Sequence, residues 1–205
     1  LETLAGATNE KKPAWYIVEN GALAEKFSLD TAINSDLTIT WKYFKVTVVN
    51  PETMQTVDVF ELGEGQTMEY YLDELYELAG VTTAKKPAWF TVVNGALAEQ
   101  YQLNAVVNSD LTITWKYFKL TIVNPETLAP LGTFELGIDQ TLADYKDAME
   151  LLASAAEKGL TPAWYAIVNN ALDRNAKWNF TTPVNADLTL TWKPYTFEYD
   201  RGRTF

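Results

Sequence analysis

The 205 residues include no cysteine and no histidine. Without cysteine the chain has no disulfide and no thiolate nucleophile or thiolate metal ligand, although this absence alone does not indicate a redox compartment. Without histidine it lacks the commonest general base and the commonest transition-metal ligand. No glycine-rich phosphate loop or serine elbow accompanies its carboxylates. We therefore predict no enzymatic activity, with no catalytic residue, no metal site and no cofactor.

Basic residues and long apolar runs are also scarce. The chain has 16 Lys and Arg and 27 Asp and Glu, so its formal charge is -11. This negative charge disfavours nucleic acid and anionic bilayers as partners. The sequence shows neither a run of 18 apolar residues that would span a membrane nor a basic-then-apolar leader. The first residue is Leu1, so we interpret the chain as a fragment of a longer protein. Its apolar content of 47% is sufficient for packed cores throughout.

Internal repetition dominates what the sequence does contain. Asn34 to Lys45 (NSDLTITWKYFK) is identical to Asn108 to Lys119, at an offset of 74 residues, and KKPAW and NGALAE recur at the same offset. A third, more divergent copy repeats VNPET from Val123 and includes NADLTLTW from Asn185. Such self-similarity is typical of tandem copies of one structural unit.

The offset predicts where each copy begins and ends. Two copies run over 45–118 and 119–195. Leu1 aligns with Leu75, so residues 1–44 form an incomplete copy that holds the second half of a helix and the last two strands. The last ten residues, 196–205, align with the first strand of a further repeat.

Each copy is predicted to contain two strands, a helix and two more strands. Two-residue alternation indicates the strands, and apolar residues at helical spacing indicate the helix. In the second copy these elements are, in order, strands at 45–50 and 56–62, a helix from Thr67 to Gly80, and strands at 87–93 and 111–117. The third copy places a longer helix between Thr141 and Gly159, with Thr141 and Asp144 as a capping pair. The fold class predicted from this order is α+β, as tandem ubiquitin-like β-grasp modules (β-β-α-β-β).

The junctions between copies show a change of apolar face. Leu37, Ile39, Trp41 and Tyr43 are apolar at odd positions, whereas the apolar positions are even from Phe44 onward. The same switch occurs at Tyr117-Phe118. Because successive strand side chains point to opposite faces, the pattern predicts that the chain passes directly from one core into the next. We therefore expect an elongated, stiff array of about 80–100 Å.

The closing strand resembles a known repeat family. TPVNADLTLTW, from Thr182 to Trp192, is similar to the closing strand of the Listeria-Bacteroides repeat, the B-repeat type of listerial internalins. The pairs Trp89-Phe90 and Trp164-Tyr165 resemble that family's tryptophan-aromatic step. The approach to this tryptophan differs, since Lys86-Pro87-Ala88 stands where the family usually has Gly-Tyr-x-Phe-x-Gly. The resemblance implies a non-catalytic module on the bacterial surface, extracellular, with adhesive or spacer roles.

The aromatic residues are the main candidates for a site. Trp15, Trp89 and Trp164 are either exposed platforms for sugar rings or core anchors, and their mid-strand positions favour the core. We predict core positions for the tryptophans of the closing strand as well; these are Trp41, Trp115 and Trp192. A third set occupies one equivalent position before the closing strand; it comprises Phe27, Tyr101 and Trp178. Packing against the module is favoured over ligand stacking for this set, and Trp178 is the weak ligand-binding candidate.

Three polar features have structural and functional interpretations. The segments Asn20 to Glu25 and Asn94 to Glu99 are either repeated binding loops or Asn-Gly turns, and the turn is favoured. Asn34-Ser35-Asp36 suggests a calcium site or a turn, and the ligand spacing of a calcium loop is missing. The acidic helix face indicates a solvated surface; it is formed by Glu69, Asp73, Glu74 and Glu77.

Two functions are compatible with these features. The first is a stiff spacer or stalk in a bacterial cell-surface or secreted protein, expected to be monomeric. The second is an adhesive binding module for a host protein or glycan. Scattered surface differences between copies favour the spacer, and a contiguous aromatic patch on one copy favours the binding module.

Overall fold

The structure, a computed structural model, describes residues 1–83, 85–153, 162–169 and 171–193. The predicted strand at 196–205 therefore lies outside the described residues. The chain forms two compact units. Unit 1 comprises residues 1–81 and 88–116, and unit 2 comprises residues 82–87 and the chain from 117 onward.

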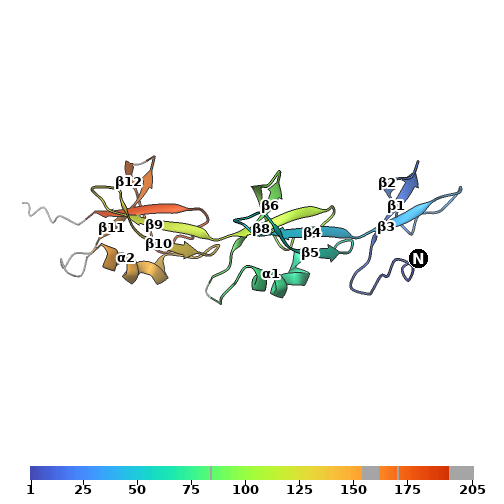
Figure 1. Cartoon of the computed structure of the whole chain (residues 1–205), viewed down its shortest axis with the longest axis horizontal. Helices are drawn as coiled ribbons and strands as arrows, with labels where there is room; N and C mark the ends of the chain where they lie inside the picture. Colours follow the sequence, from blue (N-terminus) through green and yellow to red (C-terminus); the bar gives the residue numbers. More distant parts are fainter. Residues whose placement is uncertain (84, 154–161, 170, 194–205) are drawn as a thin grey trace, which may run out of the picture. The chain divides into compact units, whose positions relative to one another are not determined.

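Unit 1 contains two sheets (Figure 1). The first has the strand order β2-β1-β3, and both pairings are antiparallel. Its strands are β1 (Ala14–Glu19), β2 (Ala22–Lys26) and β3 (Ile39–Lys42). Residues 1–7 precede it and form helical turns, with Ala5 N–H donating to Leu1 O and Ala7 N–H to Glu2 O. The same two bonds join Ala79 to Leu75 and Val81 to Tyr76 at the end of the helix in the next copy.

The second sheet of unit 1 has five strands in the order β5-β4-β8-β6-β7. The central pair β4 and β8 is parallel and the other pairs are antiparallel. A short helical segment lies between β5 and β6 in the chain, formed by a 3-10 turn, η1 (Met68–Tyr71), and one α-helix, α1 (Leu72–Leu78). The strands are β4 (Phe44–Val49), β5 (Thr56–Leu62), β6 (Ala88–Val93), β7 (Ala96–Tyr101) and β8 (Leu111–Lys116).

Unit 2 repeats this arrangement with a sheet ordered β10-β9-β13-β11-β12 and a parallel β9–β13 pair. Its helical segment is η2 (Ala143–Tyr145) followed by α2 (Lys146–Leu152). Its strands are β9 (Phe118–Val123), β10 (Pro130–Leu136), β11 (Ala163–Val168), β12 (Ala171–Lys177) and β13 (Leu188–Lys193).

The core of each complete copy lies between one face of the sheet and the helical segment. Val46 and Val48 of β4 and Ile113 of β8 are fully buried. Met68 and Leu75 are equally buried on the helical side, so the apolar stripe of the helix faces the sheet. The buried hydroxyl of Thr114 is satisfied because it donates to Val49 O at 2.7 Å.

The predicted fold class is wrong. The described residues are 44% strand and 12% helix, in three sheets with two short helices, and not a tandem β-β-α-β-β array. Three strands follow each helical segment where two were predicted. The missed strands are hairpin partners: Asn20-Gly21 and Asn94-Gly95, all with positive φ, turn the chain straight back into β2 and β7. Nearly all residues of β2 and β7 are exposed, so no apolar alternation marks them as strands.

The helix predicted from Thr67 to Gly80 is also shorter than expected. Its first four residues are a 3-10 turn, and the Thr67 side chain makes no capping hydrogen bond. In the third copy Leu142 precedes the helical segment and the predicted Thr141–Asp144 capping pair makes no such bond. The predicted extension to Gly159 falls on residues 154–161, which lie outside the described residues.

Three tryptophans predicted to be core anchors are confirmed as buried: Trp15, Trp89 and Trp164 expose 5%, 4% and 1% of their surface. Among the closing-strand tryptophans, Trp115 is buried and Trp192 half-buried. The prediction for Trp41 is wrong, since 37% of it is exposed. The sheet of Trp41 has three strands, and among the described residues no hairpin and no full helix corresponds to β4, β5 and α1.

Candidate functional site

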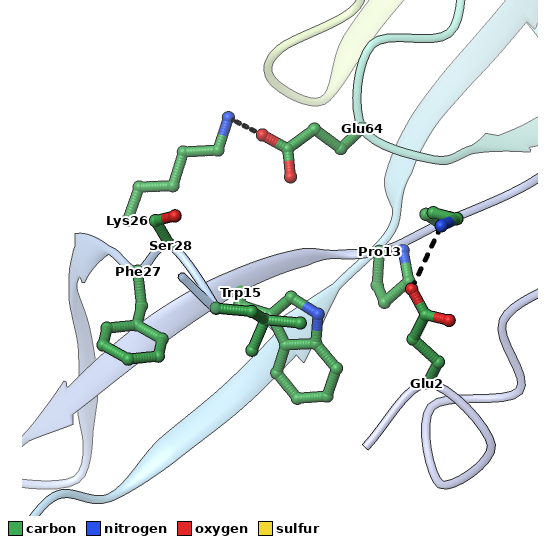
Figure 2. A pocket seen from close by; sticks show the side chains of 9 residues that line it. Glu2, Pro13, Trp15, Lys26, Phe27, Ser28 and Glu64 are labelled. Atoms are coloured by element: carbon green, nitrogen blue, oxygen red, sulfur yellow. Dashed lines mark ion pairs between the residues drawn. The ribbon is translucent and has the colours of Figure 1, made fainter. Parts of the chain in front are cut away.

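A cavity of ≈ 370 Å³ in unit 1 surrounds the face of Trp15 (Figure 2). Trp15 lies near the start of β1, and Trp41 is its cross-strand partner with ring centroids 5.9 Å apart. Phe27 directly follows β2, and its N–H donates to Trp15 O at 2.8 Å. The hairpin and the tryptophan pair therefore fix an aromatic lining, to which Leu29 and Pro13 add apolar surface.

Two ion pairs lie at the rim of this cavity, as Figure 2 shows. One joins Lys26 to Glu64, and the other joins Lys12 to Glu2 at 3.2 Å. All four side chains are between 41% and 57% exposed, so each pair contributes about 0–1 kcal/mol. Since each cation is paired with a carboxylate, the rim presents no excess of one charge to a ligand.

The cavity has no catalytic constellation. It is lined by no pair of a nucleophile and a base within hydrogen-bond reach. Within residues 1–83, 85–153, 162–169 and 171–193, no group of three or more Asp and Glu is arranged to hold a metal ion. The chemistry that remains is packing against an aromatic wall and hydrogen bonding to charged rim groups.

A second set of contacts lies where the first sheet of unit 1 meets the second. Asp110, just before β8, accepts from Lys42 Nζ at 2.8 Å and from the backbone N–H of Lys45 at 3.0 Å. Because Lys42 ends β3 and Lys45 is the second residue of β4, the Asp110 carboxylate contacts both strands at the point where the chain passes from one to the other. Burial by itself raises the pKa of Asp110, but these two hydrogen bonds and the nearby lysine charges outweigh it, so the pKa lies below its ordinary value.

The loop after β5 adds further contacts between the two sheets. Glu64 N–H donates to Lys12 O at 2.6 Å, and Gln66 Nε2 donates to Glu10 O at 2.7 Å. Gly63 lies so close that a Cβ built on it would be 2.4 Å from Lys12 O. The first sheet and the second are therefore joined by backbone contacts, beyond the covalent link at Tyr43. We call this set the junction contacts; it comprises Asp110 with Lys42 and Lys45, Gly63, Glu64 and Gln66 with Glu10 and Lys12.

Unit 2 contains the same pattern. Ile138 N–H donates to Lys86 O at 2.7 Å, and a Cβ on Gly137 would lie 2.6 Å from that oxygen. Asp187 accepts from Lys119 N–H at 3.0 Å, as Asp110 does from Lys45. Sequence reasoning missed these roles, although a signal was present: glycine recurs in FELG and aspartate in NSDLT and NADLT, which marks them as repeat positions.

Trp178, the candidate ligand-binding residue, is half-buried in unit 2. Its backbone N–H donates to Trp164 O, and its buried indole Nε1 has no hydrogen-bond partner among the described residues. Phe27 and Tyr101 are half-buried at the equivalent positions in unit 1. The Asn-Gly segments are confirmed as turns. The acidic helix face is confirmed as exposed.

Comparison with known proteins leaves the family open. The chain matches no protein-family model and no curated protein. The resemblance to the Listeria-Bacteroides repeat, and with it the surface localisation, stays a prediction. None of the described helices has the length and apolar character needed to cross a membrane.

The titration of Asp110 gives a testable consequence. Because its folded-state pKa is lowered, the carboxylate stabilises the fold above its unfolded pKa of about 4, and this contribution disappears as the pH falls through the folded value. We expect Asp110→Asn to lower the free energy of unfolding by less than about 1 kcal/mol at neutral pH, since the side chain is half exposed. The difference from the parent chain should shrink as the pH falls below about 4 and vanish once the pH lies below the folded-state pKa. Urea denaturation at several pH values measures it.

A matched control is Asp36→Asn, at the equivalent position of the first copy, where the carboxylate is exposed and has no bonding partner among the described residues. This variant should leave the free energy of unfolding unchanged at neutral pH. An Asp110→Asn effect that stays the same size as the pH is lowered, until the chain unfolds, would contradict the electrostatic explanation, because that explanation requires the ionised carboxylate.

Proposed function

We propose that this chain is a non-catalytic tandem-repeat segment of a bacterial cell-surface or secreted protein and acts as a stiff spacer or stalk. The observation that carries the proposal is the passage between sheets. β3 ends at Lys42 and β4 begins at Phe44 in the next sheet, so a single residue, Tyr43, separates them. A flexible linker would need several residues rich in glycine, serine or charge.

The junction contacts support the same conclusion for the two sheets of unit 1. Bending at Tyr43 would have to strain the Asp110 hydrogen bonds or the Glu64–Lys12 backbone bond. Tyr43 is itself held, because its hydroxyl donates to Ala5 O at 3.1 Å and the Lys11 ammonium lies 4.8 Å from its ring centroid. Three separate segments, at Ala5 to Lys12, Gly63 to Gln66 and Asp110, therefore restrain this junction.

The alternative, an adhesive module for a host protein or glycan, has less support. A platform for a sugar ring must present an aromatic face to solvent, but Trp15 exposes only 5% of its surface. Trp178 is half-buried and packs beside Trp164 through a backbone hydrogen bond. The differences between copies at the cavity rim also replace charge by polar or apolar groups, Lys26 by Gln100 and Glu64 by Ile138, without building an aromatic patch.

Spin labels on unit 1 test the spacer proposal. The chain has no cysteine, so Ala24→Cys in β2 and Ala98→Cys in β7, both at exposed and equivalent positions, give two unique labels. We expect a single narrow distance distribution by pulsed electron resonance. Insertion of a Gly-Ser-Gly-Ser segment after Lys42 should broaden it, and this is the matched control for label mobility. A distribution as broad in the parent chain as in the insertion variant would contradict the proposal and shift weight to the binding module.

A further inference from the structure

The turn that follows β12 in unit 2 (Figure 1) carries the only Asn-x-Thr sequence of the chain. Asn179 is followed by Phe180 and Thr181, and no other asparagine has Ser or Thr two residues after it. This pattern, with any residue except proline in the middle, marks an acceptor of N-linked sugars in secreted proteins. A short pattern alone does not make a site, so the geometry of the turn is decisive.

Both side chains of the pattern are accessible. Asn179 and Thr181 are exposed. The backbone closes the turn, because Thr182 N–H donates to Asn179 O at 3.0 Å. The backbone N–H of Trp178 donates to Trp164 O at 2.8 Å and ties the start of the turn to β11. The pattern therefore lies at the surface, on a turn that the sheet holds in place.

Two hydrogen bonds fix the orientation of the Asn179 amide. Its Oδ1 accepts from the backbone N–H of Thr181 at 3.1 Å and from the Thr181 hydroxyl at 3.0 Å. A backbone N–H can only donate, so the amide atom that faces it is the oxygen and not the nitrogen. Nδ2 has no hydrogen-bond partner within the described part of the chain. The nitrogen that would carry a sugar is thus available, and the hydroxyl that completes the pattern lies beside the same amide.

The other copies show that the turn does not need this asparagine. The same backbone hydrogen bond closes it in the first copy, from Thr31 N–H to Ser28 O, and in the second copy, from Ala105 N–H to Gln102 O. Ser28 and Gln102 occupy the position of Asn179. The side chain of Gln102 makes no hydrogen bond to its turn, and the turn forms all the same. Turn formation therefore leaves this position free to vary, and only the third copy has the acceptor pattern.

We propose that Asn179 is an N-glycosylation site, with Thr181 as the hydroxyl that the transferase recognises. The substrate is a sugar whose anomeric carbon carries a diphosphate leaving group, on either a nucleotide or a polyprenyl lipid. Asn179 Nδ2 forms a bond to the anomeric carbon, the bond from this carbon to the diphosphate oxygen breaks, and the diphosphate leaves with the electron pair. One Nδ2 proton passes to a base of the transferase. The product is an N-linked sugar on an exposed turn.

In the cell this modification rests on the proposed secreted or cell-surface location, because the pattern is used in proteins on that route. Stiffness of the junctions plays no part in it. The acceptor chemistry of the turn is measurable on the purified chain, which separates the site from the location. A chain that accepts the sugar but is found inside the cell would contradict the location and not the site.

The experiment incubates the folded 205-residue chain with a transferase of Asn-x-Thr specificity in two arms. One arm uses a soluble enzyme with UDP-glucose, and the other uses a membrane enzyme with a polyprenyl-diphosphate glycan. We expect a mass increase of one sugar unit per chain in at least one arm, and peptide mapping should place it on Asn179. A synthetic peptide of residues 177–185 is the positive control for each enzyme. The arm that modifies the chain identifies the source of the diphosphate-activated sugar.

Matched variants follow from the comparison of the copies. Asn179→Gln gives this turn the residue of the second copy, so the fold should be retained, as urea denaturation checks, while the mass increase is lost. Thr181→Ala should also abolish the mass increase, whereas Thr181→Ser should retain it, because serine keeps the hydroxyl. The exposed pair Gln102→Asn and Asn104→Thr builds the pattern into the equivalent turn and should add a second sugar unit.

Three results would overturn the proposal. The first is modification of the peptide without modification of the folded chain in either arm, since the turn would then not present the amide. The second is a mass increase that persists in Asn179→Gln or in Thr181→Ala. The third is a sugar on the new pattern of the second copy while Asn179 of the same chain stays unmodified.

Discussion

Replacement of Trp89 by alanine is expected to lower the free energy of unfolding of unit 1 by about 3–5 kcal/mol. The indole is 4% exposed, and its ring centroid lies 5.9 Å from that of Trp115 at a tilt of 58°. Its removal leaves a cavity between β6, β8 and the helical segment. The buried Nε1 has no hydrogen-bond partner among the described residues, so its removal also relieves an unsatisfied donor. The lower part of the range is therefore expected.

Trp41→Ala is the matched control for this measurement. It removes the same side chain from the equivalent of Trp115, but at 37% exposure, so its cost should be clearly smaller. Urea denaturation followed by amide exchange in β6 and β8 reports on the sheet that contains Trp89. A loss below about 1 kcal/mol for Trp89→Ala would mean that the ring contributes little to packing, and the sugar-platform interpretation would then regain support.

Gly63→Ala is expected to open the junction contacts of unit 1. The added Cβ would lie 2.4 Å from Lys12 O and 2.7 Å from Lys12 N, and these are backbone atoms that cannot move aside as the end of a side chain could. The Glu64–Lys12 hydrogen bond would have to break or lengthen. Overpacking of this kind costs about 1–3 kcal/mol. We expect the packing of residues 10–12 against the loop after β5 to be destabilised by that amount. Hydrogen exchange of the Glu64 amide should therefore be faster than in the parent chain.

The control for this variant is Gly65→Asn, two residues away. Gly65 has a φ of +76°, a conformation that asparagine tolerates, and a Cβ there would meet nothing within 4 Å. It should leave the Glu64 amide protected. With the Ala24 and Ala98 spin labels in place, Gly63→Ala should also broaden the distance distribution while Gly65→Asn does not. An unchanged distribution in Gly63→Ala would show that this contact does not restrain the two sheets.

The strands with an apolar face, and the direct step of the chain from one sheet into the next, were predictable because both follow from the alternation of apolar and polar residues along the sequence. The switch of apolar face at Tyr43-Phe44 coincides with the step from β3 to β4, and buried Val46 and Val48 mark the inward face of β4. The strands β2 and β7 were not predictable in the same way. They are sheet-edge strands held by backbone hydrogen bonds and an Asn-Gly turn, and their exposed side chains carry no periodic signal.

The candidate site was less accessible to sequence reasoning. The local sequence around Asp36, and the identical sequence around Asp110, indicates only a turn or a calcium site. The hydrogen-bond partners of Asp110, Lys42 and Lys45, lie more than 60 residues before it in the chain. Gly63 fits the end of a strand, and only the approach of Lys12 explains why a side chain is excluded there. Contacts between distant segments depend on how the copies meet, which no local pattern records.

The sequence by itself determined the repeat, the positions of the apolar strands, the burial of Trp15, Trp89 and Trp164, and the lack of histidine and cysteine chemistry. These properties follow from composition and from the two-residue period of a strand. Only the tertiary structure decided the five-stranded order with its parallel central pair, the edge strands β2 and β7, and the contacts of Gly63 and Asp110. The reason is physical: strand pairing and close backbone contacts depend on segments of the chain that are distant in sequence.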